Sequence, residues 1–210
     1  MTNYRRIAIA GAVLLAAVGS AARAGDRFPE IPLDQMTAEQ RQVADSITAG
    51  PRGRMSGPFN AWLRDPALAD RLQKVGEQVR FHSVLPPRLN EFAILITARA
   101  WTSQYEWSAH YPLALKGGLA PQVAADLATG RHPAGMQPDE EAVYAFCTEL
   151  HRDKRVGDAT YQTALGLFGE PGVLDLIAVT GYYVMVSMTL NVAEVLPPPG
   201  VPLPLAPFDR

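Results

Sequence analysis

Cysteine is almost absent from the 210-residue sequence: Cys147 is the only one. One cysteine excludes a disulfide within the chain and a Cys-x-x-Cys redox pair, and it argues against a cysteine-based structural zinc site. An excess of charge of one sign is also missing, since 19 Lys and Arg oppose 21 Asp and Glu. The near-neutral balance gives no electrostatic reason to expect nucleic acid or an acidic membrane surface as a partner.

Strand patterns are missing as well, because no stretch alternates apolar and polar residues between hairpin turns. Capping residues, prolines and glycines instead divide the chain into helical segments. The sequence therefore predicts one all-α domain, a compact bundle of about seven helices. The expected helices cover 38–49, 66–81, 87–101, a segment after Ser103, 119–130, 138–152, 159–169 and 171–196.

The N-terminus has the pattern of a signal peptide. Arg5 and Arg6 precede an apolar run over 7–21, and Ala-Arg-Ala at 22–24 is a typical cleavage site. We expect residues 1–24 to be removed and the protein to be exported to a bacterial periplasm, with no membrane contact afterwards. An uncleaved membrane anchor is the alternative.

Residues 173–196 are apolar enough to suggest a membrane-spanning helix. They contain Asp175, Asn191 and Glu194 and lack a basic flank, which favours the buried centre of a bundle or of an oligomer. We therefore expect a single domain over residues 25–196.

A proline-rich arm over residues 197–210 follows this domain. Proline recurs every few residues and excludes a helix there. The arm is expected either to be disordered or to pack on a neighbour through Leu203, Leu205 and Phe208.

The stretch WTSQYEWSAH at 101–110 carries the candidate chemistry. Ser103, Glu106 and His110 are spaced i, i+3 and i+7, which places them on one helical face. Glu91 lies on the preceding helix, and a helical hairpin would bring it towards that face. A histidine beside carboxylates suits proton transfer near neutral pH. We therefore predict catalytic roles for His110, Glu106 and Glu91.

Each of these residues also has a structural interpretation. Ser103 and Glu106 match a capping box, S-x-x-E. Glu91 is favoured in a first helical turn, three residues from Arg88. Tryptophans more often belong to a core than to a ligand wall.

The substrate-binding residues are predicted to be Ser103, Tyr105, Trp107 and Arg99. Aromatic side chains would form walls for a small flat ligand. Arg80, Arg88 and Arg99 are the candidates for holding a carboxylate on that ligand.

The segment PPRLNEFAIL…ARAWTSQYEWSAHYPLALKGGL resembles the core hairpin of the carboxymuconolactone decarboxylase family, which includes alkylhydroperoxidase-D-type proteins. The resemblance covers roughly residues 60–195. In the peroxidase branch the pattern is Glu, eleven residues, Cys-x-x-Cys, three residues, His. Glu91 and His110 fall on the glutamate and histidine, whereas Ser103 and Glu106 replace the two cysteines.

This resemblance implies an alkylhydroperoxidase-D-like helical subunit that assembles as a homo-trimer or homo-hexamer. It implies cofactor-independent proton transfer on a small carboxylated or lactone-type compound, by a decarboxylase, lyase or isomerase. Because both thiols are replaced, dithiol peroxidase chemistry is not expected. Two alternatives stay open. The first is a non-catalytic periplasmic protein that binds a small ligand in the same pocket. The second is metal-assisted chemistry through Glu91, Glu106 and His110, although we expect the site to hold no metal.

Overall fold

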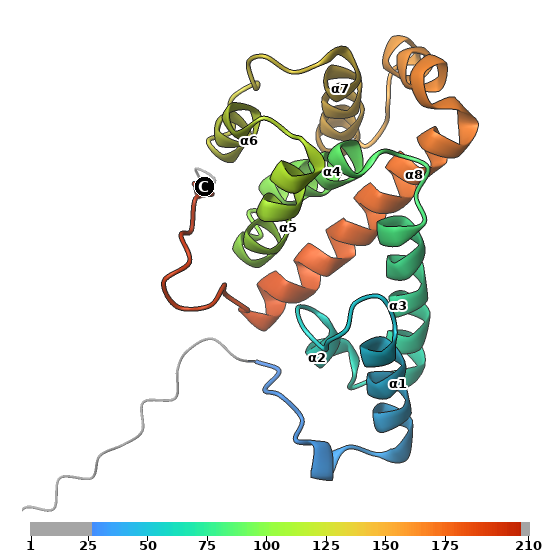
Figure 1. The fold of residues 1–210 in the computed structure, drawn as a ribbon, viewed down its shortest axis with the longest axis vertical. Coiled ribbons are helices and arrows are strands. Elements are labelled where there is room, and N and C mark those ends of the chain that lie inside the picture. Colours follow the sequence, from blue (N-terminus) through green and yellow to red (C-terminus); the bar gives the residue numbers. More distant parts are fainter. Residues whose placement is uncertain (1–26, 207–210) are drawn as a thin grey trace, which may run out of the picture.

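The computed structural model describes residues 27–206, and all regular structure in that range is helical (Figure 1). The elements in chain order are η1 (Leu33–Gln35), α1 (Ala38–Ala49), α2 (Phe59–Trp62), α3 (Pro66–Phe81), α4 (Pro87–Ala100), α5 (Gln104–Gly117), α6 (Pro121–Ala128), α7 (Pro138–Asp153) and α8 (Asp158–Ala193). The all-α prediction is therefore confirmed. The expected signal peptide, residues 1–24, lies outside the described residues.

Two helices begin at the capping signals that their sequence contains. The Thr37 hydroxyl accepts a hydrogen bond from the backbone N–H of Gln40, and the Gln40 side chain accepts one from Thr37, which completes a capping box before α1. The Asp65 carboxylate accepts the backbone N–H of Leu68, with Pro66 as the first residue of α3. These starts need only local interactions, which explains why they are readable from sequence.

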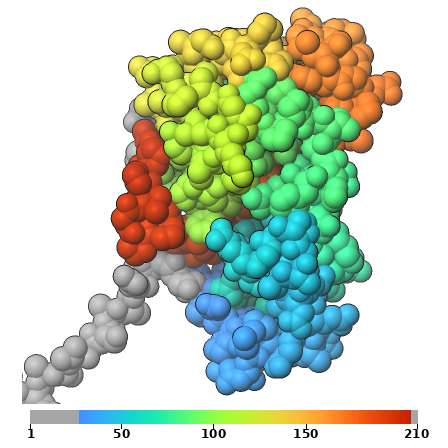
Figure 2. Space-filling view, in the orientation of Figure 1, coloured from blue at the N-terminus to red at the C-terminus, as the bar shows by residue number. Residues whose placement is uncertain are grey.

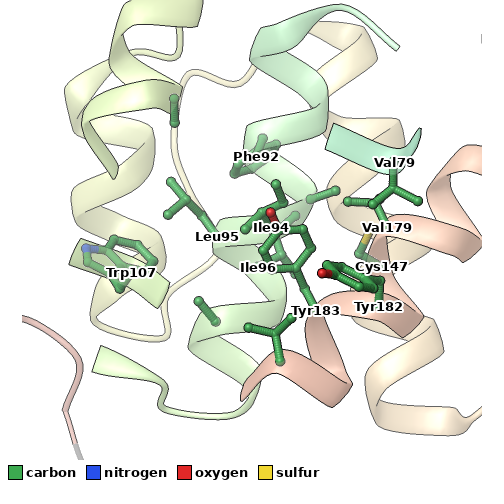
Figure 3. Close-up of a cluster of buried hydrophobic side chains, with 14 of the residues drawn as sticks. Val79, Phe92, Ile94, Leu95, Ile96, Trp107, Cys147, Val179, Tyr182 and Tyr183 are labelled. Carbon is green, nitrogen blue, oxygen red and sulfur yellow. The ribbon is translucent and has the colours of Figure 1, made fainter. Parts of the chain in front are cut away.

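Helix α4 is the centre of the molecule and packs against α5, α6, α7 and α8. Every residue from Leu89 to Ala98 is buried, as expected for a helix with neighbours on all sides. Figure 3 shows Phe92 and Leu95 of α4 in one cluster with Tyr183 of α8. Burial of a side chain of this size stabilises the fold by roughly 1.5–3 kcal/mol. Glu91 is therefore held on a rigid element.

Helix α8 crosses behind α4 and α5 and bends at Gly169, whose φ of 65° is left-handed (Figure 1). Two helices meeting near residue 170 are predicted here, and the backbone of α8 is non-helical at Gly169, so α8 consists of two helices joined by a kink. The second of them ends at Ala193 rather than near residue 196. It is the only described helix long and apolar enough to cross a membrane, and half of its apolar window is buried within this chain.

The connector before α3 contains the other difference from prediction. Residues Phe59–Trp62 form the short helix α2 inside a stretch expected to be irregular. Four residues are too few to show a helical period. Phe59 and Trp62 are both buried and meet edge to face, so packing holds this turn.

The C-terminal arm follows α8 without regular structure and runs back along α5 (Figure 1). Leu205 is buried, and its backbone N–H and C=O both bond to the Gln104 side chain. Leu203 is exposed, and Phe208 lies outside the described residues. The arm thus packs on its own chain at the corner between α4 and α5.

Candidate active site

A tight corner between α4 and α5 builds the site. Thr102 adopts a left-handed φ of 47°, and the Ser103 N–H bonds to the Ala98 carbonyl across the corner. Ser103 is the N-cap residue of α5, as predicted, but its side chain makes no capping hydrogen bond. The capping-box interpretation of Ser103 and Glu106 is therefore wrong. The corner folds α5 back along α4 and brings Glu91 to His110.

The His110 ring lies between two carboxylates. Its Nδ1 is 2.6 Å from Glu91 Oε2, and its Nε2 is 3.3 Å from Glu106 Oε2. All three side chains are buried. The Glu106 contact is an ion pair without hydrogen-bond geometry, and Glu106 Oε2 has no hydrogen-bond partner in the described chain. The structure thus brings together the three predicted catalytic residues.

The electrostatics of the cluster favour a charged ring. Burial lowers the pKa of His110, but the adjoining carboxylates of Glu106 and Glu91 raise it by more, so the pKa lies above its ordinary value. The Tyr183 ring meets the imidazole edge to face, with centroids 4.9 Å apart. Burial also raises the pKa of Tyr183 well above normal, so its hydroxyl stays neutral. The cluster can exchange a proton while Tyr183 cannot act as an anion.

A cavity of about 370 Å³ opens onto this cluster. Glu106 and His110 line it, whereas Glu91 stands behind the ring. Five aromatic residues and three arginines form half of the remaining lining: Phe59, Phe81, Tyr105, Tyr182, Tyr183, Arg52, Arg54 and Arg80. Apolar walls with a few convergent polar groups are typical of small-molecule sites.

The four predicted substrate-binding residues are distributed unequally. Tyr105 lines the cavity, but Ser103, Trp107 and Arg99 do not. Trp107 is buried and stacks on Tyr111, so it belongs to the core (Figure 3). Arg99 lies at the C-terminal end of α4, whereas Glu91 lies near the N-terminal end, and Arg99 donates a hydrogen bond to the Ala206 carbonyl of the C-terminal arm. Of the four residues, only Tyr105 forms part of the cavity wall.

Of the three arginines that the sequence offers as carboxylate ligands, only Arg80 lines the cavity. Arg88 forms ion pairs with Asp139 and Glu140 away from the cavity, whereas Arg80 lines it. Sequence reasoning missed Arg52 and Arg54, which reach the site from the connector between α1 and α2. Their signal was weak: two arginines two residues apart in a glycine-rich loop, with no spacing relation to His110. Figure 2 shows this segment in cyan beside the green helices.

The hypothesis of a metal ion bound by Glu91, Glu106 and His110 depends on whether their donor atoms are free to face one point. Both ring nitrogens of His110 already face carboxylate oxygens, so a metal ion would have to displace Glu91 or Glu106 from the ring. Within residues 27–206 no group of three or more His, Cys, Asp or Glu side chains is arranged to hold a metal ion.

The single cysteine of the chain lies in an environment that suppresses its reactivity. Cys147 is fully buried in α7, and its sulfur is 3.5 Å from the Thr180 hydroxyl. Burial raises the pKa of this thiol to about 12, which suppresses the thiolate. Cys147 is thus a packed side chain (Figure 3).

Comparison with known proteins finds a family match for the segment that contains the cluster. Residues 66–149 match the model of the Carboxymuconolactone decarboxylase family. No curated protein is a significant match. A solved structure, the alkylhydroperoxidase AhpD core of an uncharacterized peroxidase-related protein from Ralstonia eutropha JMP134, is similar with a TM-score of 0.70 and 18% identity, over 85% of this chain and 95% of that one.

A second solved structure leads to the same fold. An uncharacterized peroxidase-related protein from Silicibacter sp. TM1040 has a TM-score of 0.66 and 14% identity, over 82% of this chain and 91% of that one. At such identities the likeness concerns the fold. Residues 66–149, which include Glu91, Glu106 and His110, are therefore similar to the carboxymuconolactone decarboxylase family, and the fold of the chain is alkylhydroperoxidase-D-like.

Proposed function

We propose that this protein is an exported, cofactor-independent enzyme that transfers protons on a small carboxylated or lactone-type compound, as a decarboxylase, lyase or isomerase. One observation carries the proposal: a buried Glu91–His110–Glu106 cluster presents two of its members to a cavity with aromatic walls. A raised histidine pKa and a carboxylate oxygen without a hydrogen-bond partner supply an acid and a base side by side.

The three residues take different roles in this proposal. His110 is the main acid–base group, Glu106 is its partner at the cavity, and Glu91 holds the ring and its charge from behind. In decarboxylation the C–C bond to the carboxylate breaks, CO₂ leaves, and the electron pair delocalises into a neighbouring carbonyl. The His110 imidazolium donates a proton to the carbon that carried the carboxylate, and the ring then regains a proton from solvent. In isomerisation Glu106 removes a proton from one carbon and returns it to another.

We further propose that the enzyme is not a dithiol peroxidase. Ser103 and Glu106 stand at the positions of the two thiols in the peroxidase pattern, and Cys147 is buried in another helix. A hydroxyl and a carboxylate cannot form the disulfide that closes a dithiol cycle.

Assembly as a homo-oligomer is part of the proposal. Helix α8 exposes Leu174, Ile177, Met188 and Val192, and these positions share one narrow side of the helix. An exposed apolar stripe of this kind favours contact with another protein surface. Light scattering on the purified protein is expected to give the mass of a trimer or hexamer, and a monomer at all concentrations would contradict this part.

The second candidate is a non-catalytic protein that binds a small ligand in the same cavity. The aromatic walls and arginines favour it, since they serve binding whether or not a reaction follows. One experiment separates the two candidates: a panel of carboxylated lactones is incubated with the protein in D₂O. The enzyme proposal expects CO₂ release or deuterium incorporation at carbon. A thermal shift by the same compounds without either product would favour the binding protein.

A further inference from the structure

The cavity has cationic side chains in its lining in addition to the acid–base cluster. Arg52, Arg54 and Arg80 all line it. None of the three forms an ion pair with a carboxylate of a described residue. By contrast, Arg88 and Arg131 are paired with acidic side chains. The site therefore holds positive charge that the described part of the chain does not neutralise locally.

Of these three side chains, Arg52 is the one whose guanidinium lies over two aromatic rings. Its guanidinium carbon lies 4.8 Å from the centre of the Phe59 ring and 5.9 Å from that of Phe81. Its Nε and Nη2 atoms are buried and make no hydrogen bond of ordinary geometry to a described residue, although the neutral Tyr182 hydroxyl lies close enough to interact with the guanidinium. Burying charged N–H donors without an acceptor is costly. Two such donors on one planar group match the two oxygens of a carboxylate.

The fold makes room for this guanidinium. Gly76 is buried inside α3, where glycine is a poor helix former. A Cβ atom at this position would collide with Arg52 Nη2 and with the hydroxyl oxygen of Tyr182. The glycine therefore creates the space in which Arg52 and Tyr182 meet.

Tyr182 does not neutralise Arg52. Burial raises the pKa of Tyr182 to about 12, although the charge of Arg52 opposes the rise, so the hydroxyl stays neutral. Among the described residues that line the cavity, the one carboxylate is that of Glu106, which is already paired with the His110 ring. The missing negative charge must come from outside the described chain.

We propose that Arg52 binds the anionic group of the substrate, assisted by Arg80, and thereby selects small organic anions with a flat apolar body. This inference rests on the proposed function for its orientation: a carboxylate on Arg52 leaves the rest of the ligand between aromatic walls and directed at His110 and Glu106. Arg52 lies before the segment 66–149 that matches the family, so the selectivity comes from the connector between α1 and α2.

Calorimetric titration with benzoate and 2-furoate, and with the neutral isostere benzamide, tests this inference on the whole protein. Wild type is expected to bind both anions and to bind benzamide at least about 10-fold more weakly. Arg52→Gln is expected to weaken anion binding about 10- to 100-fold without changing benzamide binding. Arg52→Lys should lie in between, because it keeps the charge and loses the planar fork.

Arg71→Gln is the matched control, since Arg71 is exposed on α3 and bonds only to its own helix backbone. It changes the net charge by the same amount and should alter anion binding less than about 2-fold. Equal anion affinity in wild type and folded Arg52→Gln would overturn the inference. So would the absence of binding of either anion to wild type, or a loss in Arg71→Gln as large as in Arg52→Gln.

These titrations involve no turnover, which separates this inference from the proposed function. If anions bind through Arg52 but no lactone in the panel reacts, the proposed function fails and the inference stands. If a lactone reacts but Arg52→Gln binds anions normally, only the inference fails. A far-ultraviolet circular dichroism spectrum equal to that of wild type establishes that each variant is folded.

Discussion

Replacing Glu91 with glutamine should lower the pKa of His110. The Glu91 carboxylate lies 2.6 Å from Nδ1, and both groups are buried. An opposite charge at such a distance shifts a pKa by about 1–3 units, which corresponds to about 1.4–4 kcal/mol between the two protonation states. Glutamine keeps the shape and an acceptor oxygen but removes the charge. Glu106 remains as the second counter-charge, so the pKa of His110 should fall without losing the whole effect of the carboxylates.

The assay is an NMR titration of the histidine ring protons. The chain has four histidines, and a His110→Gln variant assigns the signal of interest. Glu141→Gln serves as control, because Glu141 is half-exposed and pairs with His132 rather than His110. An unchanged or raised pKa of His110 in Glu91→Gln would refute the reasoning, as would an equal fall in Glu141→Gln.

The same shift has a consequence for stability with a defined sign. The pKa of His110 is raised above 6.5 in the folded state, so its stabilisation is complete below pH 6.5. That contribution is lost as pH rises through the folded pKa. In Glu91→Gln the loss on the alkaline side of pH 6.5 should be smaller, and urea denaturation between pH 6 and 9 measures it.

The remaining predictions concern residues around the site. The pKa of His151 falls to about 4 because of burial, so the neutral ring contributes stability fully above pH 6.5 that is lost as pH falls towards 4. His151→Gln, which can keep the hydrogen bond to Thr97, should flatten this acid loss in urea denaturation, and an unchanged slope would contradict it. Trp107→Ala should lower the free energy of unfolding by about 3–5 kcal/mol, because Trp107 is a core residue. Tyr105→Ala, by contrast, should weaken benzoate binding in calorimetry with a smaller stability loss, and the reverse pattern would show that the two residues are assigned to the wrong roles.

The two S/T-x-x-E/Q sequences show how far local patterns predict structure. Thr37 and Gln40 form the capping box that their spacing indicates. Ser103 and Glu106 have the equivalent spacing, but the Glu106 carboxylate pairs with His110 instead of the backbone. A local signal predicts a local interaction only when no tertiary partner competes for the side chain.

The acid–base cluster could be predicted from the sequence, whereas the anion site could not, because they depend on contacts of different range. Glu106 and His110 are one helical turn apart, and a hairpin at the Thr102 corner suffices to bring Glu91 to them. The cluster was therefore predictable from spacing and one turn. Arg52 precedes His110 by 58 positions and reaches the cavity only because α3 packs on α8 and Gly76 leaves space. Nothing in the spacing of the sequence carries that information.

The central claim is that His110, and not a thiol, performs the chemistry. Its most direct test is the turnover of a reactive carboxylated lactone by wild type, His110→Ala and Cys147→Ala, measured as CO₂ release or deuterium incorporation. We expect a loss of about 100- to 10,000-fold in His110→Ala, which is the usual contribution of a general acid or base, and wild-type turnover in Cys147→Ala. Full turnover in His110→Ala, or its loss in a folded Cys147→Ala variant, would contradict the account.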